Sequence, residues 1–329
     1  MLLFYFLIPL SIANEFPIAP KHENQFQNYE RGPQKGFYDL LKWKLTESSK
    51  PWPEWIEEPK GKTPSQKEEK KLSITFINHA SFLIQLEGMN IITDPIWSER
   101  TSPVSWAGPQ RVREPGLKFN QVPKIDIILI SHNHYDHLDL TTLKMIELRD
   151  SPTILAGKNT CKLLQSEGSM NCREYDWWQF ELFKNLKITF VPAKHFSGRG
   201  LFDRNEVLWG GFVIESPNYG PIYFAGDTGY GKFIDMLVKK FQRFQISLLP
   251  IGAYMPRWFM KAVHMNPQEA LKAHIKLNSK QSIGMHFGTF QLTDEAIYEP
   301  EEELKKALKS EGLNEKLFIV PKFGETFTF

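Results

Sequence analysis

One run of nine residues constrains the fold of this chain most: Ser131-His132-Asn133-His134-Tyr135-Asp136-His137-Leu138-Asp139. It follows residues 125–130, a short apolar stretch of β-branched side chains that predicts a strand covered on both faces. Side chains alternate in extended backbone, so His132 and His134 point to the same side and can bind one metal ion together. Solvated surface histidines are the alternative, but three histidines and one aspartate within six residues are too dense for it.

The second half of the run predicts a second metal position. Asp136 and His137 come where the chain turns into a helix that we expect to begin near Leu140, with Asp139 as its N-cap. They can therefore face an ion beside the first one.

Three further predicted strands each end at one candidate ligand. They are residues 186–192 before His195, residues 223–225 before Asp227 and residues 282–285 before His286. A single histidine of this kind is more often an ordinary buried or surface residue than a ligand. Their shared placement favours function, because loops at one edge of a sheet are where a rigid scaffold gathers functional groups.

Composition narrows the chemistry. The 40 Lys and Arg residues against 38 Asp and Glu residues give a net charge of +2, which provides no strong attraction to nucleic acid. The only cysteines, Cys161 and Cys172, cannot form a disulfide framework or a thiolate zinc cage, and their redox state stays open. Any metal is therefore held by nitrogen and oxygen.

The chain length fits one catalytic domain with an N-terminal arm. Residues 1–13 are apolar but too short to span a bilayer, and we interpret them as a signal peptide cleaved before Asn14. The alternative is an uncleaved apolar tip that packs on the fold or on a membrane surface. We expect an exported, membrane-associated protein, or otherwise one at the cytoplasmic membrane surface.

Residues 14–71 form an aromatic and proline-rich arm and linker that cannot make a core of its own. We expect it to wrap the catalytic domain through Phe37, Tyr38, Leu41, Trp43, Trp52 and Trp55. Residues 72–329 form the hydrolase domain. It opens with an antiparallel meander over residues 72–93, and helices are predicted at residues 231–241, 267–276 and 300–311.

The ligand run, followed in order by His195, Asp227 and His286, resembles the five-part zinc signature of the metallo-β-lactamase superfamily. The resemblance implies an α/β fold, a four-layer αβ/βα sandwich of two mixed sheets with two zinc ions at one edge. It also implies the ligand sets: His132, His134 and His195 for one zinc ion, Asp136, His137 and His286 for the other, and Asp227 as the bridge.

A narrower resemblance extends over residues 72–329, to the N-acyl-phosphatidylethanolamine phospholipases D. Six segments carry it: Thr93-Asp94-Pro95, Asp176-Trp177-Trp178, Gly226-Asp227-Thr228-Gly229-Tyr230, Pro250-Ile251-Gly252-Ala253-Tyr254, Arg257-Trp258-Phe259-Met260-Lys261 and His286-Phe287-Gly288-Thr289-Phe290. The likeness implies attack of a metal-bound hydroxide on N-acyl-phosphatidylethanolamine, which yields N-acylethanolamine and phosphatidic acid.

Two other functions stay open at this point. One is a dizinc hydrolase of a soluble phosphodiester, lactone or nucleotide. The other is a metal-binding scaffold without turnover, against which the seven filled ligand positions argue.

The resemblance also suggests supporting residues. Besides Asp136, we assign catalytic roles to Asp94, which can orient a ligand histidine, and to His264, which can contact substrate. His79 suits a role behind the ligands or a purely structural one equally well. His22 and His274 look incidental.

A lipid substrate requires an apolar groove beside the metals. We expect Trp258, Phe259 and Met260 to bind substrate, with Arg257 and Lys261 near the phosphate, and Tyr135 as a further contact. Trp97 and Trp106 are further candidates for the groove. The expected partners are a phospholipid substrate and a membrane surface, with no nucleic acid, while a homodimer stays open.

Overall fold

The computed structural model describes residues 16–329 except 31, 33–34, 167 and 169–170. The predicted signal peptide, residues 1–13, lies outside these residues, so export stays a prediction. Within the described part of the chain, no helix is long and apolar enough to cross a membrane.

Two seven-stranded sheets form the centre of the protein. The first has the order β16-β3-β4-β5-β6-β7-β8, with β3–β5 antiparallel and β5–β8 parallel. Its strands are β3 (Ser73–Asn78), β4 (Ser81–Leu86), β5 (Met89–Thr93), β6 (Ile127–Ile130), β7 (Thr153–Gly157), β8 (Cys172–Tyr175) and β16 (Thr326–Thr328). The predicted meander and the predicted strand before the ligand run are both present, and β6 is buried on both faces.

The second sheet has the order β15-β14-β13-β12-β11-β10-β9, with its parallel part at β12–β15. Its strands are β9 (Phe180–Phe183), β10 (Leu186–Val191), β11 (Gly211–Glu215), β12 (Ile222–Phe224), β13 (Phe244–Pro250), β14 (Ser279–Met285) and β15 (Phe318–Ile319). Sequence analysis found the strands that end at candidate ligands and missed most of the others, because these carry no polar motif to mark where they stop.

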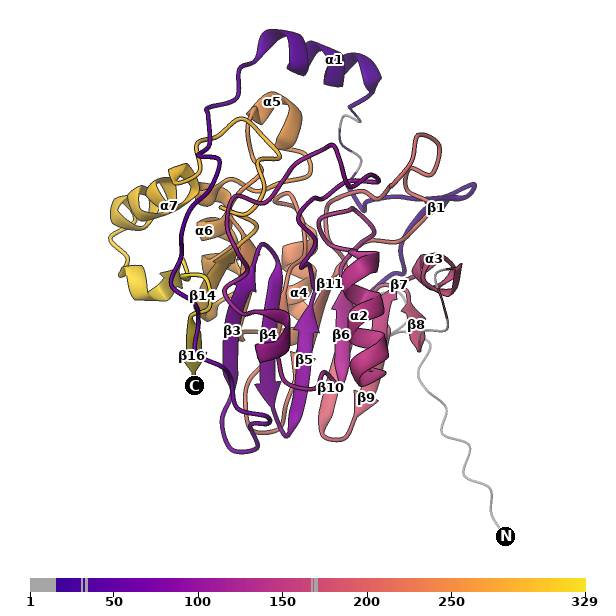
Figure 1. Ribbon diagram of the computed structural model, residues 1–329, viewed down its shortest axis with the longest axis vertical. Helices are drawn as coiled ribbons and strands as arrows, with labels where there is room; N and C mark the ends of the chain where they lie inside the picture. Colours follow the sequence, from indigo (N-terminus) through magenta and orange to yellow (C-terminus); the bar gives the residue numbers. More distant parts are fainter. Residues whose placement is uncertain (1–15, 31, 33–34, 167, 169–170) are drawn as a thin grey trace.

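The helices pack around the sheets, except that α1 and α5 lie beyond the strand ends, at the top in Figure 1. They are α1 (Phe37–Thr46), α2 (Leu140–Asp150), α3 (Thr160–Ser166), α4 (Phe233–Phe241), α5 (Arg257–Met260), α6 (Pro267–Lys276) and α7 (Glu299–Ser310), with short 3-10 turns at Phe119–Gln121 and Glu315–Leu317. The three predicted helices lie within two residues of α4, α6 and α7. Asp139 caps α2 as expected, because its carboxylate accepts the Thr141 amide at 3.2 Å.

Two apolar clusters separate the layers. The larger one includes Phe82 and Phe212 from facing sheets, and the smaller one joins β6 to α2 through Ile128 and Leu143. Burial of these faces on both sides of each sheet produces the four-layer αβ/βα sandwich that we expected.

The arm docks on the catalytic domain through fewer aromatic residues than predicted. Trp43 is buried against Phe259, with ring centroids 5.0 Å apart, and Trp52 donates to the Glu295 carbonyl at 2.9 Å. Three residues expected to pack here, Tyr38, Leu41 and Trp55, are exposed instead. For Tyr38 and Leu41 the reason is that α1 can turn only one face to the domain, and Trp43 occupies that face; Trp55 lies outside α1, and its indole donates to Glu57 at 2.9 Å. The Phe37 side chain lies outside the described residues.

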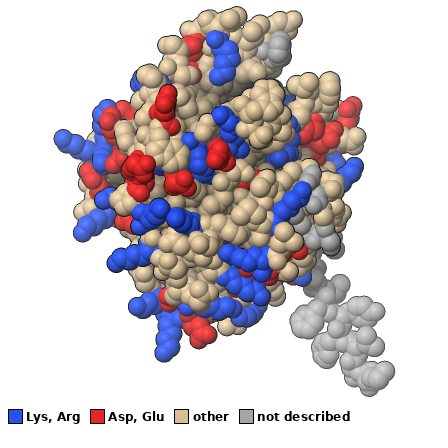
Figure 2. All heavy atoms as spheres, in the orientation of Figure 1, with Lys and Arg blue, Asp and Glu red and all other residues tan. Residues whose placement is uncertain are grey.

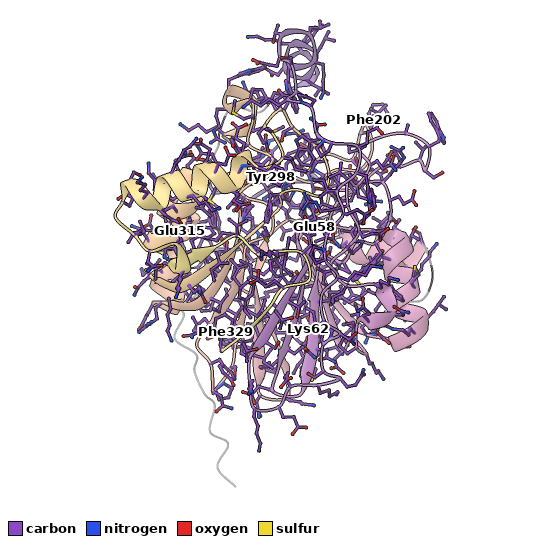
Figure 3. The ribbon with its side chains drawn as sticks, turned by 60° about the vertical axis from the view of Figure 1, so that its left-hand side comes forward. Glu58, Lys62, Phe202, Tyr298, Glu315 and Phe329 are labelled. Carbon is purple, nitrogen blue, oxygen red and sulfur yellow. A yellow bond between two sulfur atoms is a disulfide. The ribbon has the colours of Figure 1, made fainter. Side chains whose placement is uncertain are left out.

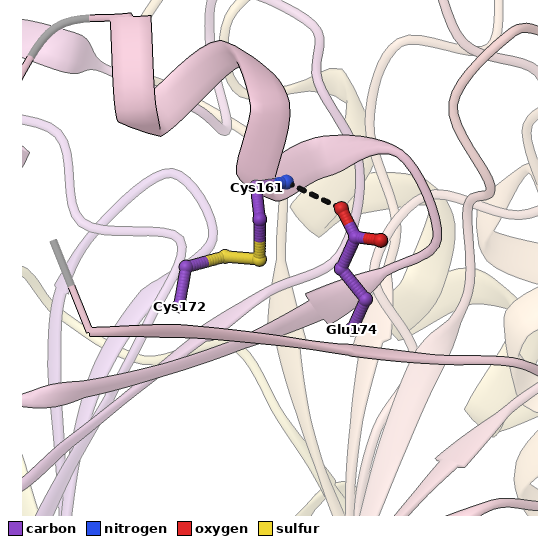
Figure 4. The surroundings of a disulfide bond; sticks show 3 residues. All are labelled: Cys161, Cys172 and Glu174. Atoms are coloured by element: carbon purple, nitrogen blue, oxygen red, sulfur yellow. Dashed lines mark hydrogen bonds between the residues drawn. A yellow bond between two sulfur atoms is a disulfide. The ribbon is translucent and has the colours of Figure 1, made fainter.

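The two cysteines form a disulfide that the sequence left open (Figure 4). Their Cα atoms are 5.5 Å apart, and the bond joins the start of α3 to β8 at the edge of the first sheet. The Glu174 carboxylate of β8 accepts a hydrogen bond from the Cys161 amide at 2.7 Å, so α3 and β8 are joined by this hydrogen bond as well as by the disulfide.

Candidate metal centre

The strand ends bring the seven predicted ligands together. The end of β6 supplies the histidine run, and the ends of β10, β12 and β14 lead to His195, Asp227 and His286. All seven side chains belong to overlapping clusters whose candidate ligand atoms lie within 4.8 Å of one another. The seven side chains therefore converge at one edge of the sheets, as expected, while the ligand roles themselves stay predictions.

Three histidines form the first cluster. The Nε2 atom of His132 lies 2.7 Å from Nδ1 of His134, and Nε2 of His195 lies 3.3 Å from the same atom. Three ring nitrogens that converge so closely are poor partners for one another but form one face of a tetrahedral metal site.

The second cluster surrounds the Asp136 carboxylate. Its Oδ2 atom lies 3.2 Å from Nε2 of His137, 3.3 Å from Nε2 of His286 and 2.9 Å from Nε2 of His79. His79 therefore belongs to the site, where it contacts a candidate ligand, and is not an unrelated loop histidine.

Asp227 lies between the two clusters. Its Oδ2 atom is 3.1 Å from Nε2 of His286 and 3.2 Å from that of His137 on one side, and 3.7 Å from Nε2 of His195 on the other. One carboxylate oxygen in reach of both histidine sets is the arrangement expected of a bridging ligand.

The unpaired atoms of the site fit a pair of cations. Nε2 of His137 and Oδ1 of Asp227 are buried without a hydrogen-bond partner among the described residues. The outer nitrogens are held instead: Nδ1 of His137 by Asp94 at 2.7 Å and Nδ1 of His195 by the Val263 carbonyl at 2.9 Å. A hydrogen bond to Nδ1 orients the imidazole ring so that the lone pair of Nε2 points at the place where a metal would bind. A set of nitrogen and oxygen donors without thiolate suits a divalent ion.

The histidine pKa values differ between the two clusters: they are lowered at His134 and His195 and raised at His286. Burial lowers the pKa of His134 to about 3 and that of His195 to about 4, so both rings are neutral and can donate a lone pair at neutral pH. Burial also acts to lower the pKa of His286, but the charges of Asp227 and Asp136 outweigh it and raise that pKa to about 9. The carboxylates thus attract positive charge to the place where a second cation would bind.

Asp94 and His264 take different positions. Asp94 lies behind the cluster, where Oδ2 accepts from His137 and from the Ser131 hydroxyl at 2.6 Å. This contact fits the expected role of orienting a ligand histidine, so Asp94 is a positioning residue in the site and its function stays a prediction. His264 lies in the site, with Nδ1 4.0 Å from Oδ2 of Asp227.

A cavity of about 500 Å³ opens beside His195. Apolar residues line part of it, including Phe196, Phe259 and Val263. Cationic residues line another part, namely Lys35, Lys194 and Arg204, and the arm completes the wall with His22, Gln27, Asn28 and Glu30. The sequence suggested that His22 is incidental, but its side chain lines this cavity.

Of the predicted aromatic cluster only Phe259 lines this cavity. The Trp258 indole faces the arm, where it donates to Glu47 at 3.1 Å, and Met260 is buried. Arg257 is held by Glu269 at 2.7 Å and does not line this cavity, so its expected contact with phosphate stays a prediction without support there. The short α5 helix can turn only one of three consecutive side chains toward the cavity.

Three other expected contacts lie elsewhere. Trp97 packs on Phe119 and donates to the Leu117 carbonyl at 3.1 Å, and Trp106 is 80% exposed. Tyr135 lines a separate cavity of about 1070 Å³, and its hydroxyl donates to the Arg199 carbonyl at 3.2 Å. These residues therefore do not form the wall of the cavity at His195.

Sequence analysis missed two residues that hold the ligands. Asn28 of the arm donates to the His195 carbonyl at 2.8 Å and accepts its amide at 3.1 Å. Arg199 donates to the carbonyls of Asn133 and Leu138, both at 2.9 Å and both within the ligand run. Neither carries a local signal, since each contact joins segments more than 60 residues apart.

Comparison with known proteins places this site in a family. The β-lactamase superfamily domain matches residues 89–287. N-acyl-phosphatidylethanolamine-hydrolyzing phospholipase D 1 of Caenorhabditis elegans is 38% identical over 274 residues, or 78% of this chain and 76% of that protein. The mitochondrial enzyme of the same description from Saccharomyces cerevisiae is 38% identical over 250 residues, or 74% of this chain and 53% of that protein.

The fold has solved relatives as well. Isothiocyanate hydrolase from Delia radicum gut bacteria matches 78% of this chain and 98% of its own, with a TM-score of 0.64 and 20% identity, which shows the fold alone. The chain is a metal-dependent hydrolase of the metallo-β-lactamase fold. Within that superfamily it belongs with the N-acyl-phosphatidylethanolamine-hydrolysing phospholipases D.

Proposed function

We propose that this protein is a zinc-dependent phosphodiesterase that hydrolyses N-acyl-phosphatidylethanolamine to N-acylethanolamine and phosphatidic acid. The observation that carries the proposal is the cavity beside His195, because its wall combines apolar side chains with three cations next to a candidate ligand. A phospholipid has the same two parts, an apolar tail and an anionic phosphodiester. The similarity to two relatives of that description supports this choice of reaction.

The donor set assigns the residues that would hold two zinc ions. They are His132, His134 and His195 for the first, Asp136, His137 and His286 for the second, and Asp227 for both. Ions at these places would supply Lewis acidity toward a phosphoryl oxygen and would lower the pKa of a water toward neutrality.

The side chains of the chain itself bind and orient the substrate. Phe196 and Phe259 contact an acyl chain, and Lys194 and Arg204 attract the phosphate from the rim of the cavity. His264 is placed to hydrogen-bond the oxygen that leaves, since it lies beside Asp227 and its Nδ1 atom has no partner among the described residues. Burial lowers its pKa well below the usual value, so it meets the substrate as a neutral imidazole.

The disulfide supports an oxidising compartment, as expected for an exported protein. We include export and action at a membrane surface in the proposal. Sequencing the amino terminus of protein recovered from its native host tests this, because an intact Met1 would argue against cleavage before Asn14.

The reaction is tested on purified, zinc-loaded protein. N-acyl-phosphatidylethanolamine, plain phosphatidylethanolamine and a bis-aryl phosphodiester are compared in detergent micelles, with Asp227→Ala as the inactive control. We expect the N-acylated lipid to be the best substrate and to yield phosphatidic acid. Efficient turnover of the soluble diester alone would instead support the soluble-substrate alternative.

A further inference from the structure

The loop of residues 197–205 carries two large apolar side chains that the fold does not use. Leu201 is 91% exposed and Phe202 is 90% exposed, and the two are adjacent in the chain. Figure 3 shows Phe202 at the upper end of the molecule, which is also where α1 lies in Figure 1. Side chains of this size contribute to folding only when they are buried, so their presence at a loop tip calls for a partner.

The loop holds its shape through its own hydrogen bonds. The Asp203 carboxylate accepts the Arg199 amide at 2.8 Å and the Gly200 amide at 2.7 Å. At the base, the Asn205 amide donates to the Ser197 carbonyl at 2.9 Å. The turn is therefore ordered before any partner binds, and Leu201 and Phe202 are presented outward with little further cost in conformational entropy.

The same loop lies between the two cavities and against the metal centre. Arg204 lines the cavity beside His195, and Arg199 and Gly200 line the larger one. Arg199 also bonds two carbonyls within the ligand run, those of Asn133 and Leu138. Whatever binds the loop tip therefore lies at the mouth of the site.

The charges around the tip indicate which partner it fits. Lys35, Lys194 and Arg204 line the cavity, where Lys194 pairs with Glu30 at 3.4 Å and Lys35 with Asp39 at 3.6 Å, so Arg204 leaves the wall with a net positive charge. On the face shown in Figure 2, Lys and Arg side chains are interspersed with Asp and Glu side chains. Apolar side chains beside cations match an anionic phospholipid surface, which takes the former into its acyl region and the latter at its phosphates.

We propose that residues 197–205 form a membrane-insertion loop, in which Leu201 and Phe202 enter an anionic phospholipid bilayer and bring the mouth of the cavity at His195 to the headgroups. The proposal names a partner for the site and so rests on the proposed function. It is tested by binding to vesicles without substrate, so the two can fail separately.

The experiment compares two double variants of the full, zinc-loaded chain. The tip variant, Leu201→Ser with Phe202→Ser, removes the two apolar side chains of the loop tip. The control, Phe180→Ser with Leu182→Ser, removes a matched apolar pair on the edge strand β9, where these residues are 51% and 64% exposed. Co-sedimentation with phosphatidylcholine and phosphatidylserine vesicles gives the partition coefficient. We expect the partition coefficient of the tip variant to fall roughly 10- to 100-fold and that of the β9 variant to equal the wild-type value. Turnover of the soluble diester and the melting temperature should stay unchanged in the tip variant.

A second measurement locates the tip directly. In Phe202→Trp, brominated acyl chains should quench more tryptophan emission than in wild type. Equal vesicle binding by wild type and the tip variant overturns the proposal, and so does an equal loss in the β9 variant. A change of oligomeric state with no change in vesicle binding would assign the tip to a second copy of this chain. If N-acyl-phosphatidylethanolamine is not hydrolysed but the tip variant loses vesicle binding, only the proposed function fails.

Discussion

At the scale of single residues, the centre depends on which nitrogen of each histidine is left free. Asp94 holds Nδ1 of His137, and Ser131 contacts Nδ1 of His132 at 2.9 Å, so the Nε2 atoms of both rings face Asp227. Nε2 of His137 lies 3.2 Å from both Asp136 and Asp227, so the inner nitrogens and these carboxylates surround one place where a cation can bind. Residues that touch no substrate therefore decide the geometry of those that do.

Replacing Asp227 with Ala should weaken both metal sites, because its Oδ2 atom lies within 4.0 Å of histidines from each set. Metal content after dialysis against zinc-free buffer measures this, with Asp235→Ala, which removes an exposed carboxylate of α4, as control. Two tightly held zinc ions in the Asp227 variant would refute the bridging role.

Replacing Asp94 with Asn should lower metal affinity about 10- to 100-fold at the site of His137, and less at the site of His132. The change keeps the shape of the side chain, and Asn accepts the positive φ of 30° found there. Competition with a chromogenic chelator would resolve the two affinities. Equal losses at both sites would indicate a general loosening of the fold instead of a role through His137.

At the scale of elements, the strand ends place the ligands and the outer elements keep the strands in position. The disulfide holds α3 against β8, and α6 packs on β13 and β14, the latter of which ends at His286. Neither contact touches the metal centre. Their loss should therefore affect stability before it affects chemistry.

Removing the disulfide with Cys161→Ser and Cys172→Ser should lower the free energy of unfolding by about 2 to 3 kcal/mol, since the bond closes a short loop of the unfolded chain. The two cysteines are 11 residues apart. Urea denaturation measures the loss, and zinc content should stay unchanged. Two reactive thiols in native, unreduced protein would contradict the pairing.

His274 of α6 should make stability depend on pH. Its Nδ1 atom lies 2.8 Å from the Ser282 hydroxyl, and burial lowers its pKa from 6.5 to about 4. As the pH falls from 6.5 to 4, the unfolded chain takes up this proton first, so stability decreases by at most about 3 kcal/mol over that range. Above pH 6.5 the histidine has no such effect, because it is neutral in both states.

The comparison that tests this is His274→Gln against wild type, by urea denaturation at several pH values. The difference in unfolding free energy should shrink or reverse toward pH 4. Parallel curves for the two proteins would show that His274 does not titrate in this way.

At the scale of the whole molecule, the N-terminal arm reaches across the catalytic domain to a candidate ligand. Asn28 bonds both the amide and the carbonyl of His195 and also accepts from the Trp209 indole at 3.1 Å. Parts of the arm, Ala19 and Phe26, belong to the main core. The arm is thus part of the site as well as a cover for the domain.

Asn28→Ala should lower zinc affinity at the site of His195 by about tenfold while the protein stays folded, because the backbone of that ligand loses two hydrogen bonds. Asn218→Ala offers a control, since this exposed asparagine bonds Glu87 far from the centre. Unchanged zinc affinity in the Asn28 variant would limit the arm to a structural role.

The sequence by itself determined the elements with strong local patterns. β3 to β6 carry alternating or continuous apolar side chains, and α6 has its Asn266 cap, so hydrogen bonding and burial within a few residues were enough to predict them. The same holds for the histidine run, since three imidazoles and a carboxylate within six residues have few uses other than a metal. Their spacing also predicted which pairs share a cluster.

Tertiary structure alone decided how the cavity is built and what holds the ligands. Phe259 lines the cavity and packs on Trp43 of α1, while Trp258 lies outside the cavity and donates to Glu47, so the arm contacts both side chains. Asn28 and Arg199 act on backbone segments far away in the chain, and Leu201 and Phe202 stand out only once the core is known to be complete without them. Contacts of this kind depend on the packing of distant segments, for which a local sequence pattern holds no signal.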